Sequence, residues 1–191
     1  MMGLQPRRFH CRMLSRRRIT ALAVARRHAS PRAMAAWIDA PPEAPAEFQD
    51  RGLLWRRVEA AERRRDAQLA RVITASLPWP VPWSALRRYV CEQFVERGMV
   101  ADVAVFPPAR PGALPRLHLM LTTRAIGPEG FGKKRREWNE RGLLQQWRTE
   151  WKALWGAAVP EAPPAAAAVP ASGLARIVRV LGTVLGRRRA R

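Results

Sequence analysis

The sequence predicts an α+β domain in which helices pack on an antiparallel sheet. Two segments, residues 99–106 and 117–123, alternate apolar with polar or small residues, a pattern typical of half-buried strands. Three longer segments repeat apolar residues at intervals of about 3.6 positions, as amphipathic helices do. These segments span residues 51–77, 84–96 and 137–154. Strands that follow each other in the chain, with helices before and after them, favour the α+β class.

Residues 1–46 form a basic N-terminal segment with weak secondary-structure signals. Residues 1–38 hold nine arginines and no carboxylate. They lack the continuous apolar stretch of a secretory signal peptide. We expect a short strand around Phe9–Leu14 and a short helix around Ile19–His28.

Prolines and glycines set the boundaries of the other elements. The proline- and acid-rich segment 38–50 is typical of a loop that leads into a helix. Three prolines within residues 78–82 end the first long helix, because each lacks an N–H donor and restricts the residue before it. Gly98 ends the second helix, and the glycine-rich segment 127–136 is expected to be a loop.

The C-terminal residues differ in composition from the rest. Residues 157–173 are rich in proline and alanine, which indicates a linker. Residues 174–191 place arginines around an apolar stripe, which fits an arm that binds a membrane surface or nucleic acid, or a loosely docked end. We therefore divide the chain into an N-terminal segment (1–46), a folded domain (47–156), the linker and the tail.

Length and charge restrict the function classes. A chain of 191 residues that is 48% hydrophobic can bury one core. Its formal net charge of +20 attracts polyanions, nucleic acid first and acidic membranes second. No apolar run approaches the roughly 20 residues that span a bilayer, and the two cysteines, Cys11 and Cys91, fit reduced thiols. We expect a cytoplasmic protein without a membrane partner.

Arginine supplies nearly all of the positive charge, since lysine occurs only at positions 133, 134 and 152. Guanidinium groups bind phosphate through two parallel hydrogen bonds and stack on bases, so this bias fits a nucleic-acid-binding surface. A GC-rich genome would enrich the same codons without any functional need. Both explanations stay open at this point.

A resemblance to a known family rests on three stretches: RVEAAERRRDAQLARVITASLP (57–78), QFVERGMVADVAV (93–105) and LHLMLTTRAIGPEGFGKKRREWNERGLLQQWRTEW (117–151). Over residues 48–155 the chain resembles the MobA/MobL family of plasmid relaxases. The resemblance implies an HUH-type fold in which an antiparallel sheet carries three histidines around one divalent metal, Mg²⁺ or Mn²⁺. It also implies a tyrosine on an N-terminal helix. The metal would polarise a DNA phosphate, and the tyrosine would attack it.

Several positions depart from the pattern that the resemblance implies. The paired histidines of the family correspond to Arg116 and His118, and the third ligand position holds Phe106. His118 is the metal ligand that remains, and His10, on the predicted first strand, could assist it. Arg26 stands where the tyrosine is expected. We therefore assign no catalytic residue, and we expect the N-terminal part of the fold to be incomplete, with one sheet segment missing before the long helix.

A basic cluster is the stronger candidate for DNA contact. Four consecutive cations follow a glycine-rich stretch, and flexible glycines beside cations suit a track for phosphate groups. The only tyrosine, Tyr89, falls in the predicted helix 84–96, where packing explains it better than catalysis. The predicted DNA-binding residues are Arg116, Arg124, Lys133, Lys134, Arg135 and Arg136.

These observations predict a MobA/MobL-like protein of plasmid mobilisation and conjugative DNA transfer. We expect it to bind single-stranded DNA at a transfer origin, alongside other mobilisation proteins, and to be impaired in metal- and tyrosine-dependent nicking. Two alternatives stay open. One is a non-enzymatic basic protein that binds DNA or a membrane surface, and the other is the product of a decaying relaxase reading frame.

Overall fold

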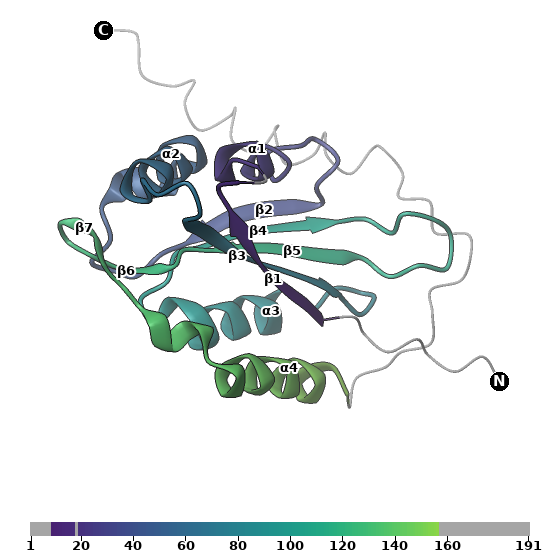
Figure 1. Cartoon of the computed structure of the whole chain (residues 1–191). Helices are drawn as coiled ribbons and strands as arrows, with labels where there is room; N and C mark the ends of the chain where they lie inside the picture. Colours follow the sequence, from purple (N-terminus) through teal and green to yellow (C-terminus); the bar gives the residue numbers. More distant parts are fainter. Residues whose placement is uncertain (1–8, 18, 157–191) are drawn as a thin grey trace, which may run out of the picture.

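Five antiparallel strands form the centre of the molecule, and helices cover both faces of this sheet (Figure 1). The computed structural model describes residues 9–17 and 19–156. The strand order is β1-β3-β5-β4-β2, and each neighbouring pair is antiparallel. This confirms the predicted α+β class. The strands are β1 (Phe9–Ser15), β2 (Ala35–Asp39), β3 (Gln68–Ser76), β4 (Ala101–Phe106) and β5 (Arg116–Leu121).

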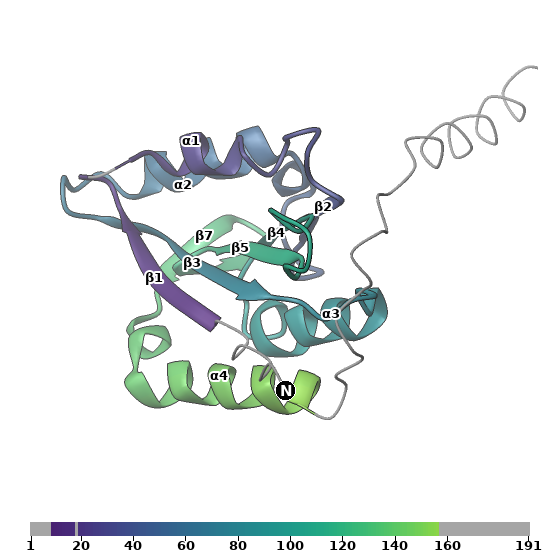
Figure 2. The ribbon, with the colours of Figure 1, turned by 90° about the vertical axis from the view of Figure 1, so that its right-hand side faces the viewer.

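Two layers of helices enclose the sheet (Figure 2). The first layer is made of α1 (Ala21–Ala25) and α2 (Arg51–Ala61), and the second of α3 (Trp83–Val90) and α4 (Arg141–Gly156). Short helical turns accompany them: a π-helical turn, Cys91–Val95, continues α3, and the 3-10 turns Ala46–Gln49 and Arg136–Asn139 precede α2 and α4.

The alternation of side chains along β5 distributes them over two separate cores. Leu117, Leu119 and Leu121 pack in the core on the side of α3 and α4, together with the buried Trp147. Met120 packs in the other core, on the side of α1 and α2. The sequence pattern predicted this two-sided arrangement, because successive residues of a strand point to opposite faces of its sheet.

Side-chain caps and one glycine fix the ends of the helices. Thr20 Oγ1 accepts a hydrogen bond from the N–H of Ala23 at the start of α1 (3.1 Å). Asp50 Oδ1 accepts one from the N–H of Leu53 at the start of α2 (2.7 Å). Both are preferred N-cap residues, because their short side chains reach these free N–H groups. Gly98, at φ +92°, ends the helical segment that follows α3, as predicted.

The predicted helix over residues 51–77 is wrong in its second half. α2 ends at Ala61, and residues 68–76 form β3, a strand with a partner on each side. Both faces of β3 are covered, so its buried residues form a nearly continuous run instead of alternating with exposed ones. Such a run fits a helix as well as a strand, because Leu69 and Ile73 also fall at helical spacing.

The sheet contains a strand between α1 and α2, a segment that we expected to be missing. The predicted strand near Phe9–Leu14 and the predicted helix near Ile19–His28 are confirmed as β1 and α1. In addition, residues 35–39 form β2, which pairs with β4 at the edge of the sheet. Only Ile38 is buried in β2, so this strand carries little of the apolar signal on which strand prediction depends.

The glycine-rich segment 127–136 was expected to be a loop, and this is also wrong, because it belongs to a hairpin. β6 (Arg124–Gly127) pairs with β7 (Gly130–Lys134) in a separate two-stranded sheet. Gly130 adopts φ +94° at the turn, a conformation that glycine takes without a steric penalty. Glycine is depleted in strands generally, and three glycines in this segment therefore disguised the hairpin.

The remaining predicted elements agree with the structure to within a few residues. Residues 84–96 contain all of α3 except Trp83, together with its π-helical turn, and residues 137–154 contain most of α4. The predicted linker (157–173) and basic tail (174–191) lie outside the described residues. Among the helices of residues 9–17 and 19–156, none is long and apolar enough to cross a membrane.

Leu119 tests the packing at the centre of the sheet. It lies between Ile73 of β3 and Val103 of β4, and all three side chains are buried. Leu119→Ala should lower the free energy of unfolding by about 2–5 kcal/mol, because it removes buried methyl groups and leaves a cavity. Urea unfolding followed by tryptophan fluorescence measures this change. The control Arg110→Ala, at an exposed position, should change the free energy of unfolding by less than about 0.5 kcal/mol. Equal losses in both variants would contradict the burial of Leu119 in the core.

Candidate nucleic-acid interface

An open cavity of about 680 Å³ lies at the end of the sheet where β5 begins. β3, β4 and β5 contribute lining residues, as does the segment that follows α1. Four of the lining residues are arginines and none is a carboxylate, so the cavity is strongly positive. We call it the arginine cavity. Its lining residues are Arg26, Arg27, Ser30, Arg32, Thr74, Phe106, Arg116 and His118.

His118 belongs to a chain of three polar side chains that runs from the cavity into the core. Its Nδ1 contacts Nε2 of His28, and Nδ1 of His28 lies 2.8 Å from Oδ1 of Asp102. The two imidazole rings are nearly perpendicular. His28 is 1% exposed and Asp102 is fully buried, so water does not compete for the inner contact. We call these three residues the histidine chain.

Asp102 receives further hydrogen bonds from α2. Arg51 Nε donates to its Oδ1 (2.9 Å), and Trp55 Nε1 donates to its Oδ2 (2.8 Å). An ionised carboxylate can only accept, so Nδ1 of His28 must donate as well. Three donors thus satisfy one buried charge, as a buried carboxylate requires. Nε2 of His118 is the ring nitrogen that remains for a ligand in the cavity.

The surroundings of His118 keep its imidazole neutral. Burial lowers the pKa of His118 from 6.5 to about 4, and the nearby groups of His28, Arg12, Arg116 and Arg27 act in the same direction. Loss of hydration and nearby positive charge both disfavour the protonated ring. At neutral pH, His118 therefore offers a hydrogen-bonding group to the cavity without adding a charge to it.

The positions that the resemblance gives to the metal ligands lie together, but two of the three no longer carry ligands. Phe106, Arg116 and His118 all line the arginine cavity. Mg²⁺ and Mn²⁺ need several oxygen or nitrogen donors, and only His118 supplies one. In the described part of the chain, no group of three His, Cys, Asp or Glu side chains is placed to hold a metal ion. The residues present therefore do not fit a divalent metal.

His10, which the sequence suggested as a helper of His118, lies elsewhere on the sheet. It pairs with Thr74 of β3, and Thr74 pairs with His118 of β5. His10 is therefore on the same face of the sheet as His118 but two strands away, about 10 Å at the usual spacing of strands. The two imidazoles are too far apart to share one ion.

No tyrosine is available at the cavity. Arg26 lines it at the position where the family resemblance expects the tyrosine. Tyr89, the only tyrosine of the chain, lies on α3 and packs in the core on the opposite face of the sheet. Its hydroxyl donates to the backbone oxygen of Trp147 (2.9 Å), and burial raises its pKa. Tyr89 is a packing residue, as its place in the sequence indicated.

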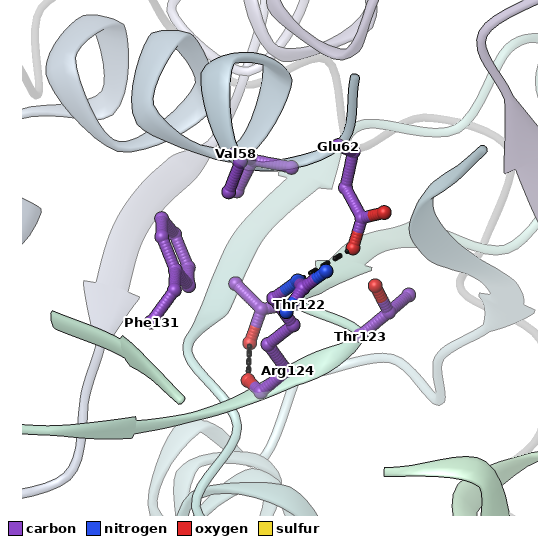
Figure 3. Close-up of a pocket in the computed structure, with 7 residues that line it drawn as sticks. Val58, Glu62, Thr122, Thr123, Arg124 and Phe131 are labelled. Atoms are coloured by element: carbon purple, nitrogen blue, oxygen red, sulfur yellow. Dashed lines mark hydrogen bonds and ion pairs between the residues drawn. The ribbon is translucent and has the colours of Figure 1, made fainter. Parts of the chain in front are cut away.

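Two of the predicted DNA-binding cations form ion pairs with Glu62 at the end of α2. Glu62 Oε1 pairs with Arg124 Nε (2.8 Å), and Glu62 Oε2 pairs with Lys134 Nζ (3.3 Å). Figure 3 shows Glu62 and Arg124 pointing toward each other, near Phe131 of β7. Glu62 is only 6% exposed. These contacts fasten the β6–β7 hairpin to α2 and give Arg124 and Lys134 a structural role.

The six predicted DNA-binding residues do not form one surface. Arg116 lies at the start of β5 in the arginine cavity, whereas Arg124 follows the end of this strand. The strand alone separates them by roughly 17 Å. In Figure 1 the β6–β7 hairpin and the loop between β4 and β5 lie at opposite ends of the sheet. Lys133, Arg135 and Arg136 are exposed at the hairpin end.

Sequence reasoning missed most of the arginine cavity and the buried part of the histidine chain. Arg27, His28 and Arg32 follow α1 and are far from His118 in the sequence, so no spacing rule connects them. Asp102 was the one available signal. A carboxylate in the middle of an otherwise apolar strand is costly to bury, and it therefore indicates that polar partners lie beside it.

Comparison with known proteins shows the family of this chain. The model of the MobA/MobL family matches residues 27–163. Because this is well over half of the chain, the protein belongs to the MobA/MobL family. The match begins before the stretch 48–155 that carried the sequence resemblance, and it includes His28 and β2.

Two curated relatives are conjugal transfer proteins. The chain is 40% identical over 85 residues to the conjugal transfer protein TraA of Rhizobium radiobacter, a stretch that covers 42% of this chain and 8% of that protein. The probable conjugal transfer protein TraA of Sinorhizobium fredii is also 40% identical over 85 residues, which cover 42% of this chain and 7% of that protein. The chain thus matches less than a tenth of the length of these relatives.

Solved structures share the fold at low sequence identity. One, described as the molecular basis of vancomycin resistance transfer in Staphylococcus aureus, has a TM-score of 0.65 and 22% identity, covering 78% of this chain and 89% of that chain. It shows that the two chains have the same fold. The MobM relaxase domain bound to a 26-nucleotide oriT DNA of pMV158 has a TM-score of 0.47 and 11% identity, over 91% of this chain and 99% of that one. This second likeness is too distant to support an inference.

The lowered pKa of His118 predicts that the protein loses stability in mild acid. The pKa is 6.5 in the unfolded chain and about 4 in the folded one. Between these values the unfolded state binds more protons, so the free energy of unfolding falls as the pH drops from 6.5 toward 4. His118→Asn should flatten this dependence. Thermal unfolding midpoints across this pH range measure it, and an unchanged slope in the variant would assign the dependence to another group.

Proposed function

We propose that this MobA/MobL-family protein binds single-stranded DNA at a transfer origin during conjugal transfer and lacks metal- and tyrosine-dependent nicking. The observation that carries the proposal is the arginine cavity, in which four arginines surround His118 and no carboxylate is present. Such a site attracts the phosphate backbone of a nucleic acid. The proposal places the chain in the cytoplasm, with other mobilisation proteins as further partners.

The arginines of the cavity are available to a ligand. None of Arg26, Arg27, Arg32 and Arg116 forms an ion pair with a residue that the structure describes. Their guanidinium groups stay charged at physiological pH and bind phosphate oxygens through paired N–H donors. This distinguishes them from Arg124 and Lys134, whose charges are partly balanced by Glu62.

Phe106 supports a single strand as the ligand. Its ring lines the cavity beside the arginines and is partly exposed. An unpaired base can stack on an aromatic ring, whereas the bases of a duplex stack on each other. Cations that follow the backbone, combined with an aromatic side chain, are the usual means of binding single strands without sequence preference.

The side chains that line the arginine cavity also support the proposed loss of nicking. Cleavage of a phosphodiester by this route needs a nucleophile and stabilisation of negative charge on the phosphate oxygens. Arg26 has no nucleophilic oxygen, and Tyr89 is buried on the other side of the sheet. The cavity therefore retains groups that stabilise the charge of a phosphate but lacks both the tyrosine and the metal site.

The salt dependence of DNA binding tests the role of the cavity. Binding of a fluorescein-labelled oligo-dT, measured by fluorescence anisotropy, should weaken steeply with salt. Arg26→Ala/Arg27→Ala should reduce the slope of log K against log salt by about 1.4, because each phosphate contact to a single strand contributes about 0.7. The control Arg88→Ala/Arg141→Ala removes the same charge from exposed positions on α3 and α4. Equal losses in the two double variants would contradict a role for the cavity.

An assay of plasmid relaxation tests the loss of nicking. Purified protein is incubated with supercoiled plasmid that carries a transfer origin, in Mg²⁺ or Mn²⁺. We expect no relaxed circles and no covalent protein–DNA adduct on a denaturing gel, since the tyrosine and two of the three implied ligands are absent. Relaxed circles that form with Mn²⁺ and disappear with EDTA would overturn this part of the proposal while leaving DNA binding intact.

A further inference from the structure

We infer that the arginine cavity binds a phosphate group of DNA directly, without a divalent metal, and that the guanidinium of Arg116 supplies the positive charge there. The inference rests on the proposed function, because it takes DNA as the ligand. It adds the chemical group that is recognised, a phosphodiester, and the residues that recognise it.

The balance of charge in the cavity favours an anion over a cation. Four guanidinium groups line it, and the buried carboxylate behind it, Asp102, already receives hydrogen bonds from three donors. One of these donors is the cation Arg51, whose Nε lies 2.9 Å from Oδ1. Asp102 therefore has no charge left to balance a metal ion. A divalent cation would be repelled at short range, whereas a phosphate would accept charge-assisted hydrogen bonds.

Arg116 and His118 lie side by side in the arginine cavity. They are two residues apart on β5, so their side chains leave the same face of the strand. Arg116 is exposed and His118 is half-buried beside it. Nδ1 of His28 donates to Asp102, so Nε2 of a neutral His28 accepts from Nδ1 of His118. Nε2 of His118 then keeps a lone pair, which a phosphate oxygen cannot hydrogen-bond, so the guanidinium of Arg116 is the donor to the bound group.

The buried part of the histidine chain prepares this site before a ligand arrives. His28 and Asp102 are almost fully buried, and their contact fixes the ring against which His118 rests. A ring that is already oriented loses little conformational freedom on binding, which favours affinity.

The first experiment compares binding with and without metal. The dissociation constant for fluorescein-labelled oligo-dT is measured by anisotropy in EDTA and in Mn²⁺, at matched ionic strength. We expect equal values for the unmodified protein. Arg116→Gln should weaken metal-free binding by about tenfold, the usual effect of losing one charge-assisted hydrogen-bonding group. Arg116→Lys should give an intermediate dissociation constant, because lysine keeps the positive charge but lacks the paired N–H donors of the planar guanidinium. The control Arg88→Gln, at an exposed position on α3, should bind like the unmodified protein.

The second experiment restores imidazoles at the two altered positions. Phe106→His/Arg116→His gives the cavity three imidazoles together with His118. This variant should bind DNA weakly in EDTA and should gain affinity when Mn²⁺ is added. The inference is overturned if the unmodified protein requires Mn²⁺, if the double variant binds as tightly as the unmodified protein in EDTA, or if Mn²⁺ gives the double variant no gain. Thermal unfolding of each variant verifies that it is folded.

Inorganic phosphate separates a failure of this inference from a failure of the proposed function. In a spectrum of the histidine rings recorded by NMR, phosphate should shift the signals of His118 in the unmodified protein but not in Arg116→Gln. If DNA binds, yet phosphate leaves His118 unchanged and Arg116→Gln binds DNA normally, the inference is wrong and the proposed function stands. If phosphate shifts His118 while no DNA binds, the proposed function is wrong and the cavity remains an anion site.

Discussion

The buried carboxylate of Asp102 is the constraint on which the candidate site depends. A charge in the core must be paired, because leaving it without its partner costs roughly 3–5 kcal/mol. The partners come from separate segments: His28 follows α1, and Arg51 and Trp55 belong to α2. A single group on β4 thus ties both segments to this face of the sheet. It also determines, through His28, how the ring of His118 meets the cavity.

Periodicity in the sequence reports a regular alternation of residue types, and this explains which elements it could predict. β4 and β5 were found because large apolar residues alternate with small or polar ones, although β4 is buried on both faces. α3 and α4 were found from their amphipathic repeat. β3 is also covered on both sides, but adjacent large apolar residues such as Val72 and Ile73 interrupt any alternation, and its run of buried residues was taken for a helix. β2 has hardly any dry face, since only Ile38 is buried, and it left no signal. Neither strand therefore shows a regular alternation.

The site was predictable only where a motif extends along one strand. His118 and Arg116 were placed together because they are two residues apart on β5. The contact of His118 with His28 crosses 90 residues of sequence, and it depends on how the segment after α1 returns to the sheet. The pairing of Arg124 with Glu62 crosses 62 residues. A cluster of charges can be counted in a sequence, but the partners that neutralise some of them appear only in the folded chain.

The residues that line the arginine cavity lie at strand ends and in a loop, outside both cores. Arg26, Arg32 and Arg116 are exposed, whereas the neighbouring Leu117 is buried. Exchanges at such exposed positions usually alter stability by less than about 0.5 kcal/mol. At these arginines, contact with a ligand is therefore separate from the stability of the fold, whereas His28 and Asp102 serve both. Evolution can therefore replace these arginines one at a time, and each replacement is selected on function alone because the fold survives it.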